Sequence, residues 1–122
     1  MSAVETAAEG VGPSGLRKIA DLYLASCFEG ETPPQVNELA ALLGLEPHQL
    51  ADLFRELLGS TPSDYLKHGQ VSHAQLLLRT TSLSLNAIAY ASGFGTRATF
   101  YRAFHRVTGT TPGAYRAGRS SK

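Results

Sequence analysis

The chain is predicted to be all-α, with about seven helices arranged as two copies of one unit. The segment Gly59-Ser60-Thr61-Pro62-Ser63-Asp64-Tyr65 returns fifty positions later as Gly109-Thr110-Thr111-Pro112-Gly113-Ala114-Tyr115. A repeat of this kind indicates a duplicated structural unit. Apolar residues recur at helical spacing, glycines and prolines separate the apolar stretches, and no segment shows the alternation typical of a strand.

The similarity between the two copies extends upstream of this segment. Leu50 and Phe54 precede the first copy as Phe100 and Phe104 precede the second. Further back the offset falls to forty-nine, where Leu39-Ala40-x3-Gly44-Leu45 corresponds to Ile88-Ala89-x3-Gly93-Phe94, so the second copy carries one extra residue between Phe94 and Phe100. Each copy predicts a helix, a glycine-containing turn, a second helix and a proline-started helix. This is the pattern of a duplicated helix-turn-helix.

The first elements follow from local signals. Residues 1–15 are rich in Ala, Gly, Glu and Ser and are expected to form a flexible tail or linker. The next stretch, with apolar residues at helical spacing, predicts a helix over about residues 16–28. The segment Thr32-Pro33-Pro34-Gln35 predicts the start of the second helix, with Thr32 as N-cap, proline in the first turn and Gln35 completing a capping box. Gly44 is expected to end this helix in a left-handed turn.

The remaining elements are marked by prolines and capping residues. Pro47 opens a helix that Gly59 ends, and a long helix is expected over residues 62–80, spanning roughly 28 Å. Ser84 and Thr96 are expected to cap the next two helices, and a short last helix begins at Thr111-Pro112. The predicted domains are a tail at 1–15, a first subdomain at 16–61, a connector helix at 62–80, a second subdomain at 81–118 and a tail at 119–122.

Charge divides the chain into two unlike parts. The net charge of the whole chain is +1, but the charges are unevenly distributed. Residues 1–64 hold three basic residues and all ten acidic residues, which gives a net charge of −7. Residues 65–122 hold eight basic residues and no acidic one, a net of +8. A basic region without carboxylates predicts binding to a polyanion, and the alternative is a solvated face with scattered arginines.

The composition also narrows the class of protein. The single cysteine, Cys27, cannot form an internal disulfide and is expected to be a packed thiol. No apolar run approaches the roughly 20 residues of a membrane span, and the N-terminus lacks the pattern of a signal peptide. A cytoplasmic location without membrane association is therefore expected. No catalytic constellation is recognised, and His68 and His73 lack the spacing of a zinc site, so no enzyme activity, cofactor or metal is predicted.

The second unit resembles a known family at fixed spacings. Its pattern is Ser84-Leu85-x2-Ile88-Ala89-x3-Gly93-Phe94-x5-Phe100-x-Arg102-x-Phe104-x4-Gly109-x-Thr111-Pro112-x2-Tyr115-Arg116. This pattern, with its degenerate first copy, resembles the AraC/XylS family of bacterial transcription regulators over about residues 16–118.

The resemblance implies seven helices, two helix-turn-helix subdomains and a connector at residues 62–80. The two recognition helices would enter successive major grooves, about one DNA turn apart. Members of that family commonly regulate transcription initiation, usually as activators that touch RNA polymerase. The implied partners are double-stranded DNA and RNA polymerase, which would associate the protein with the nucleoid. Because one chain carries two units, we expect a monomer on DNA.

The candidate base-reading residues of the second unit lie opposite its apolar stripe. The stripe is Phe100, Phe104 and Val107, and by resemblance the outward positions contact bases: Arg97, Ala98, Tyr101 and Arg102. Arg102 is the first candidate for a guanine, since a guanidinium matches two acceptors on that base. Phosphate contacts are predicted for His105, Arg106, Arg116 and the helix N-terminus at Ser84. Tyr115 is a candidate for stacking on a base or for packing in the core or between helices, and its pairing with Tyr65 in the repeat favours packing.

The first unit departs from the pattern at the same positions. Its outward residues are His48, Ala51 and Asp52, followed one turn later by the basic Arg55, a predicted phosphate contact. Asp52 stands where a hydrogen-bond donor is usual, and Glu46 stands where a serine cap is expected. Asp52 either reads a cytosine amino group or weakens binding by facing phosphates of like charge. We therefore expect affinity to reside mainly in the second unit. The alternative function is a protein-interaction adaptor with weak DNA binding.

Overall fold

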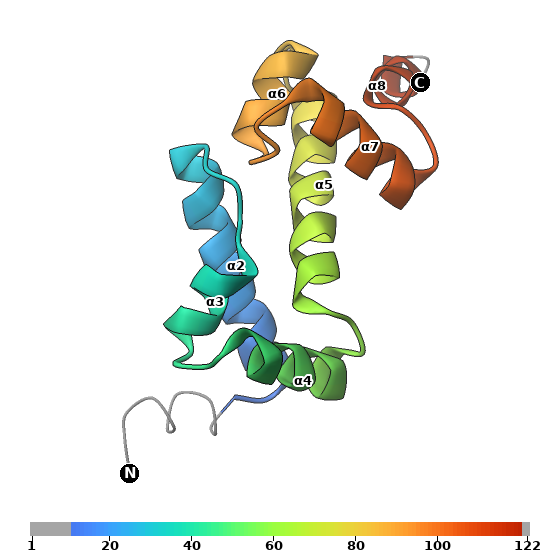
Figure 1. Ribbon diagram of the computed structural model, residues 1–122. Coiled ribbons are helices and arrows are strands. Elements are labelled where there is room, and N and C mark those ends of the chain that lie inside the picture. The colour runs from blue at the N-terminus through green and yellow to red at the C-terminus, as the bar shows by residue number, and fades with distance from the viewer. Residues whose placement is uncertain (1–10, 121–122) are drawn as a thin grey trace. The chain divides into compact units, whose positions relative to one another are not determined.

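The computed structural model describes residues 11–120, and this part of the chain contains seven helices and no strand. The all-α prediction is confirmed. The helices are α2 (Pro13–Gly30), α3 (Val36–Leu42), α4 (Pro47–Leu58), α5 (Pro62–Thr80), α6 (Leu85–Ala91), α7 (Arg97–Thr108) and α8 (Pro112–Ser120). The connector predicted over residues 62–80 is the continuous helix α5 (Figure 1).

The described chain divides into two compact units, and α2 and α5 each contribute to both. The first unit contains the described residues up to Ala25 together with Pro34–Leu66. The second contains Ser26–Pro33 and the described residues from Lys67 onward. The predicted limits, with 62–80 as a separate connector, stay a prediction.

The first unit buries one apolar face from each of its helices. Leu16 of α2, Leu39 of α3, and Leu50 and Phe54 of α4 are completely buried. Ala40 is also buried, as expected for a small side chain where helices approach closely. The core therefore follows the helical spacing seen in the sequence.

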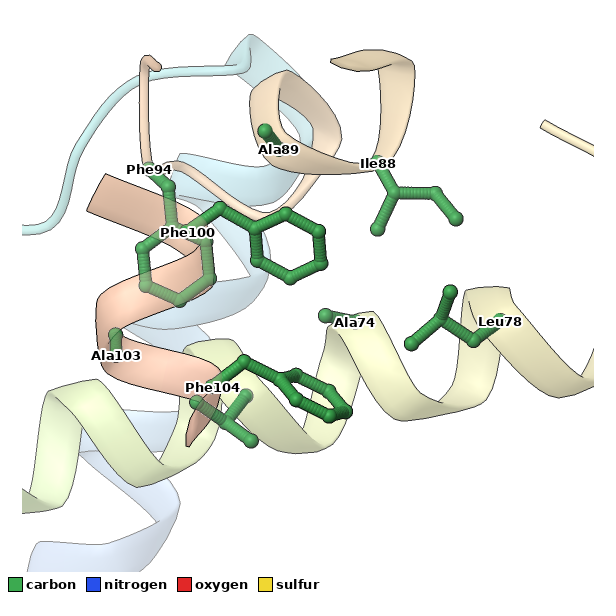
Figure 2. Close-up of a cluster of buried hydrophobic side chains, with 9 residues drawn as sticks. Ala74, Leu78, Ile88, Ala89, Phe94, Phe100, Ala103 and Phe104 are labelled. Atoms are coloured by element: carbon green, nitrogen blue, oxygen red, sulfur yellow. The ribbon is translucent and has the colours of Figure 1, made fainter. Parts of the chain in front are cut away.

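The core of the second unit contains three phenylalanines. It joins α5, α6 and α7 through nine buried residues: Val71, Ala74, Leu78, Ile88, Ala89, Phe94, Phe100, Ala103 and Phe104. Phe100 and Phe104 project from the same side of α7 into this cluster (Figure 2). Because the inward face of α7 is fixed in this way, its opposite face is directed to solvent.

The predicted start of the second helix is wrong. α3 begins at Val36, with Gln35 as the N-cap in an extended conformation and without a capping hydrogen bond from its side chain. The Gln35 N–H instead donates to the hydroxyl of Tyr23 on α2 (2.8 Å), while the Thr32 hydroxyl donates to the carbonyl of Cys27 (3.5 Å). A contact from a neighbouring helix thus replaces the local cap that the sequence predicts.

The start of the first helix also differs from the prediction. α2 begins at Pro13, three residues before the predicted start, so it includes residues 13–15 of the predicted tail. Residues 1–10 of that tail, and residues 121–122 at the other end, lie outside the described residues.

The extra residue of the second copy has a structural role. Gly95 has a positive φ of 79° and precedes Thr96, whose hydroxyl accepts the N–H of Thr99 (3.1 Å) and caps α7. The first copy lacks this residue, and α4 follows Glu46 directly. There the Gln49 side chain accepts the backbone N–H of Glu46 (2.9 Å). The two copies therefore cap their recognition helices differently, with Thr96 in the second and a capping box of Glu46 and Gln49 in the first.

Candidate nucleic-acid interface

The two helix-turn-helix segments share the same turn. In the first, the N–H groups of Gly44 and Leu45 donate to the carbonyls of Ala41 (3.0 Å) and Ala40 (2.9 Å). In the second, Gly93 and Phe94 donate to Tyr90 (3.0 Å) and Ala89 (2.9 Å). Both glycines have a left-handed conformation, with φ of 70° and 79°, which a side chain would strain. The repeat seen in the sequence is therefore a repeat of backbone geometry.

The Gly-x-Thr-Pro-x2-Tyr tails also adopt equivalent structures. Tyr65 packs edge-on against Phe54 with ring centroids 5.5 Å apart, and Tyr115 packs in the same way against Phe104 at 5.5 Å. Each tail thus holds its recognition helix, α4 or α7, through an aromatic pair. The prediction that both tyrosines pack against the core is confirmed.

The outward face of α7 carries most of the predicted base-reading residues. Arg97, Ala98 and Arg102 are exposed, and Tyr101 is half-buried because its ring packs edge-on against Phe100 (centroids 6.0 Å apart). Among the described residues, Arg102 has no hydrogen-bond or ion-pair partner. Its guanidinium is therefore available to a ligand.

The predicted phosphate contacts on α7 lie one turn further along the same helix. His105 and Arg106 are exposed in its last turn. With Arg97 and Arg102, they give α7 three arginines and no carboxylate. A helix with this composition attracts anions along its exposed face.

Arg97 is held by Tyr101 one turn away. The Arg97 Nη2 donates to the Tyr101 hydroxyl (3.1 Å), and its guanidinium carbon lies 5.1 Å from the centre of the tyrosine ring. A cation above an aromatic ring is stabilised by about 0.5–1 kcal/mol at an exposed site. The interaction restricts Arg97 to the outer side of the helix before any ligand binds.

The outward face of α4 differs in charge. His48 and Asp52 are exposed, and Ala51 is half-buried. Arg55 Nη1 donates to Asp52 Oδ1 at 3.2 Å, and both side chains remain largely exposed, at 66% and 72% respectively. The predicted phosphate contact of the first unit is therefore already paired with a carboxylate. The exposed Glu56 follows it on the same helix, so the charges of α4 do not favour an anion.

Two further predicted phosphate contacts have partners within the protein. The guanidinium of Arg116 donates to the backbone carbonyls of Leu78 (3.4 Å), Thr81 (3.2 Å) and Leu83 (2.7 Å). The Ser84 hydroxyl accepts the N–H of Ala87 (3.1 Å), which confirms Ser84 as the cap of α6. The phosphate contacts of both residues stay a prediction.

Several supporting contacts were not recognised in the sequence. The buried side chain of Gln70 on α5 donates to the carbonyl of Ser92 in the turn between α6 and α7 (3.1 Å). Arg79 on α5 donates to the hydroxyl of Tyr115 (2.8 Å). These pairs are separated by 22 and 36 residues, so no local spacing indicates them. The Asp52–Arg55 and Arg97–Tyr101 pairs, by contrast, have helical spacings that could have revealed them.

The two groups with a shifted pKa, Tyr65 and His73, lie outside the outward faces of α4 and α7. Burial, then the hydrogen bond from its hydroxyl to Asp21 Oδ1 (2.8 Å), raises the pKa of Tyr65 to about 12. Burial lowers the pKa of His73, whose ring stacks on that of Phe28 with centroids 4.1 Å apart. Cys27 is a buried free thiol, as predicted. Both pKa shifts therefore concern the stability of the fold.

Residues 11–120 show features of neither a membrane span nor a metal site. None of the helices there is long and apolar enough to cross a membrane. Within the same residues, no group of three or more His, Cys, Asp or Glu side chains is placed to hold a metal ion.

The known proteins that this chain resembles are regulatory proteins, and the matching family model is a helix-turn-helix domain. A family model described as a helix-turn-helix domain matches residues 39–118. The chain is 40% identical over 86 residues to the HTH-type transcriptional regulator GlxA of Rhizobium meliloti (strain 1021), covering 70% of this chain and 26% of that protein. It is 35% identical over 78 residues to the arabinose operon regulatory protein of Escherichia coli (strain K12), covering 64% and 27%. The chain therefore spans about a quarter of the length of these relatives.

Among solved structures, this chain resembles the DNA-binding domain of AdpA, with a TM-score of 0.75 at 29% identity. AdpA is a global transcriptional factor, and its domain was crystallised with a target DNA. The match covers 91% of this chain and 96% of that domain. An AraC-type regulator from Chromobacterium violaceum has a TM-score of 0.67 at 28% identity, covering 85% and 95%. Since the family model covers most of the chain and these relatives agree with it, the chain belongs to the AraC-type family of helix-turn-helix domains.

Proposed function

We propose that this chain binds double-stranded DNA in a sequence-specific manner and regulates transcription initiation, with α7 as its principal reading helix. The observation that carries the proposal is the outward face of α7, where Arg97, Arg102 and Arg106 are exposed and no carboxylate is present. Proteins recognise a duplex through arginine and lysine contacts to phosphates and through side chains directed at base edges. The AdpA domain, which has a similar fold, was crystallised on DNA.

Each residue of α7 has a role in this proposal. Arg102, exposed and without a partner among the described residues, donates to the two major-groove acceptors of a guanine. Arg97 is held by Tyr101 and reads a second base, and Ala98 allows the helix to approach the groove closely. His105 and Arg106 contact phosphates, which fix the helix on the duplex without selecting sequence.

The first unit has a weaker role in DNA binding. His48 and Ala51 face the duplex when α4 enters a neighbouring major groove, while Asp52 and its paired Arg55 add little net attraction. The two recognition helices occupy successive grooves, and the chain binds as a monomer. RNA polymerase is the proposed protein partner, and activation the proposed outcome, by analogy with the regulators that it resembles.

Salt-dependent binding tests this proposal. Duplexes selected from a random pool should bind with an affinity that falls steeply with salt. The slope of log affinity against log salt concentration should be about −0.9 for each phosphate neutralised. Arg106→Gln should reduce that slope by about one unit, whereas Glu29→Gln, a charge change on α2, serves as the control. Absence of any enriched duplex at low salt would overturn the proposal.

One observation favours a second function, that of a protein-interaction adaptor. The charges of α4 are balanced by the Asp52–Arg55 pair and followed by Glu56, so this helix offers little to a polyanion. An adaptor would bind a protein through α4 and show little duplex binding at any ionic strength. The same salt titration separates the two functions.

A further inference from the structure

We infer that Arg116 is a positioning residue, which holds the connection between α5 and α6 and so sets the helix-turn-helix that presents α7. This inference rests on the proposed function for its consequence in DNA binding. Arg116 lies on α8 and is half-buried. It is 33–38 residues from the three carbonyls that it contacts, so it ties together segments that are distant in the chain.

The three carbonyls belong to the end of α5 and to the loop that follows it. The last carbonyls of a helix lack partners within the helix, and a nearby cation stabilises them. Leu78 is in the last turn of α5, and Thr81 and Leu83 lie between that helix and the cap of α6. A guanidinium has five donors in a rigid planar arrangement, so one side chain can bind all three oxygens at once.

The loop itself is ordered by a second set of contacts. The Thr81 hydroxyl donates to the Leu77 carbonyl (2.7 Å) and accepts the N–H of Leu83 (3.3 Å). The next residue, Ser84, accepts the N–H of Ala87 and begins α6. Arg116 therefore acts at the point where the direction of α6 is set.

The residue before Arg116 connects the same helix to α7. Tyr115 packs against Phe104 of α7 and accepts a hydrogen bond from Arg79 of α5. Two successive residues of α8 thus link α5, the loop before α6 and the recognition helix. In the first copy the position equivalent to Arg116 is Leu66, which is buried and apolar, so this arrangement is specific to the second unit.

The inference is tested with Arg116→Lys and Arg116→Met, with Arg106→Lys and Arg106→Met as matched variants on α7. Lysine keeps the charge but cannot bind three carbonyls in a plane. Without DNA, amide hydrogen exchange at Ala87 should become about tenfold faster in both Arg116 variants. The loop before α6 loses hydrogen bonds to the charged guanidinium, so the cap that binds the Ala87 N–H opens more often. It should be unchanged in both Arg106 variants. Thermal unfolding of each variant identifies the temperature range in which it is folded.

With the selected duplex, both Arg116 variants should lose about tenfold in affinity while the salt slope stays within half a unit of the wild type. Arg106→Met should lower the slope by about one unit and Arg106→Lys should keep it. Two results would overturn the inference. The first is that Arg116→Lys keeps the wild-type amide exchange at Ala87 and the wild-type affinity, while Arg116→Met lowers the salt slope. The second is that amide exchange becomes faster in the Arg116 variants but their affinity for the duplex is unchanged. If the wild type binds no duplex, the proposed function fails, and the exchange comparison alone decides whether Arg116 holds the loop.

Discussion

The two helix-turn-helix segments share the geometry of their turns but have different outward faces. Both turns use a left-handed glycine, and both recognition helices are held by a tyrosine packed against a phenylalanine. On α7 the outward face carries three arginines, whereas on α4 the position equivalent to Arg102 is Asp52, paired with Arg55. A duplicated scaffold is therefore kept by its core and turn residues, while its chemistry depends on a few exposed positions.

The largest expected effect comes from removing the principal arginine of α7. Arg102→Ala should weaken binding to the selected duplex by about 1–3 kcal/mol, roughly 5- to 150-fold, because a guanine loses a bidentate partner. His48→Ala on α4 should change affinity less than threefold. Fluorescence anisotropy at fixed salt measures both, and equal losses would show that the two helices contribute alike.

A smaller effect in the opposite direction is expected on α4. Asp52→Asn should tighten binding by about threefold, since it removes a charge that repels phosphates and frees Arg55, and exposed pairs are worth roughly 0.2–1 kcal/mol. Glu29→Gln is the control for net charge. A loss of affinity in Asp52→Asn, with altered preference at one base pair, would instead mean that Asp52 reads a cytosine.

The paired tyrosines should differ in their dependence on pH. The folded pKa of Tyr65, about 12, lies above its ordinary value of 10.0, so the neutral form is favoured by folding. This stabilisation is complete below pH 10 and is lost as pH rises from 10 through 12. In Tyr65→Phe, the decrease in the free energy of unfolding between pH 10 and 12 should be smaller than in the wild type. In Tyr115→Phe, this decrease should be the same as in the wild type. Each variant should cost about 0.5–1.5 kcal/mol at pH 7 by chemical denaturation, through one lost hydrogen bond.

A further prediction concerns the turn between α6 and α7. Ser92 is completely buried, and its hydroxyl has no hydrogen-bond partner within residues 11–120, whereas the first copy has the apolar Leu43 at this position. Ser92→Ala should stabilise the fold by up to about 1 kcal/mol, because a buried unpaired hydroxyl is removed. Ser82→Ala, in an exposed loop, should leave the unfolding free energy unchanged. Destabilisation by Ser92→Ala would indicate that the hydroxyl has a partner.

Much of the fold could be predicted from the sequence because its signals are local. Gly44, Gly93 and the Thr-Pro pairs mark turns and helix starts by their own backbone preferences, and the bounds of α5 agree with the prediction. The start of α3 could not be predicted, because the N–H of Gln35 is satisfied by Tyr23 from another helix. Local capping rules do not include such a contact.

The candidate site also has features that local sequence signals predict and features that they do not. The outward positions of α7 follow from helical periodicity, once the phenylalanines are assigned to the core. The contacts of Arg116 and of Gln70 join residues more than twenty positions apart, and they became visible only with the structure. A basic residue in a sequence is readily interpreted as a phosphate contact, although the same guanidinium is equally suited to backbone carbonyls.

The most direct test of the difference between the two helices is methylation interference on the selected duplex. Methylation of guanine N7 blocks a major-groove acceptor, so it weakens binding wherever an arginine reads that base. We expect one cluster of interfering guanines, which disappears in Arg102→Ala and persists in His48→Ala. Two clusters of equal strength about one helical turn apart, with one lost in each variant, would contradict the claim that α7 carries most of the recognition.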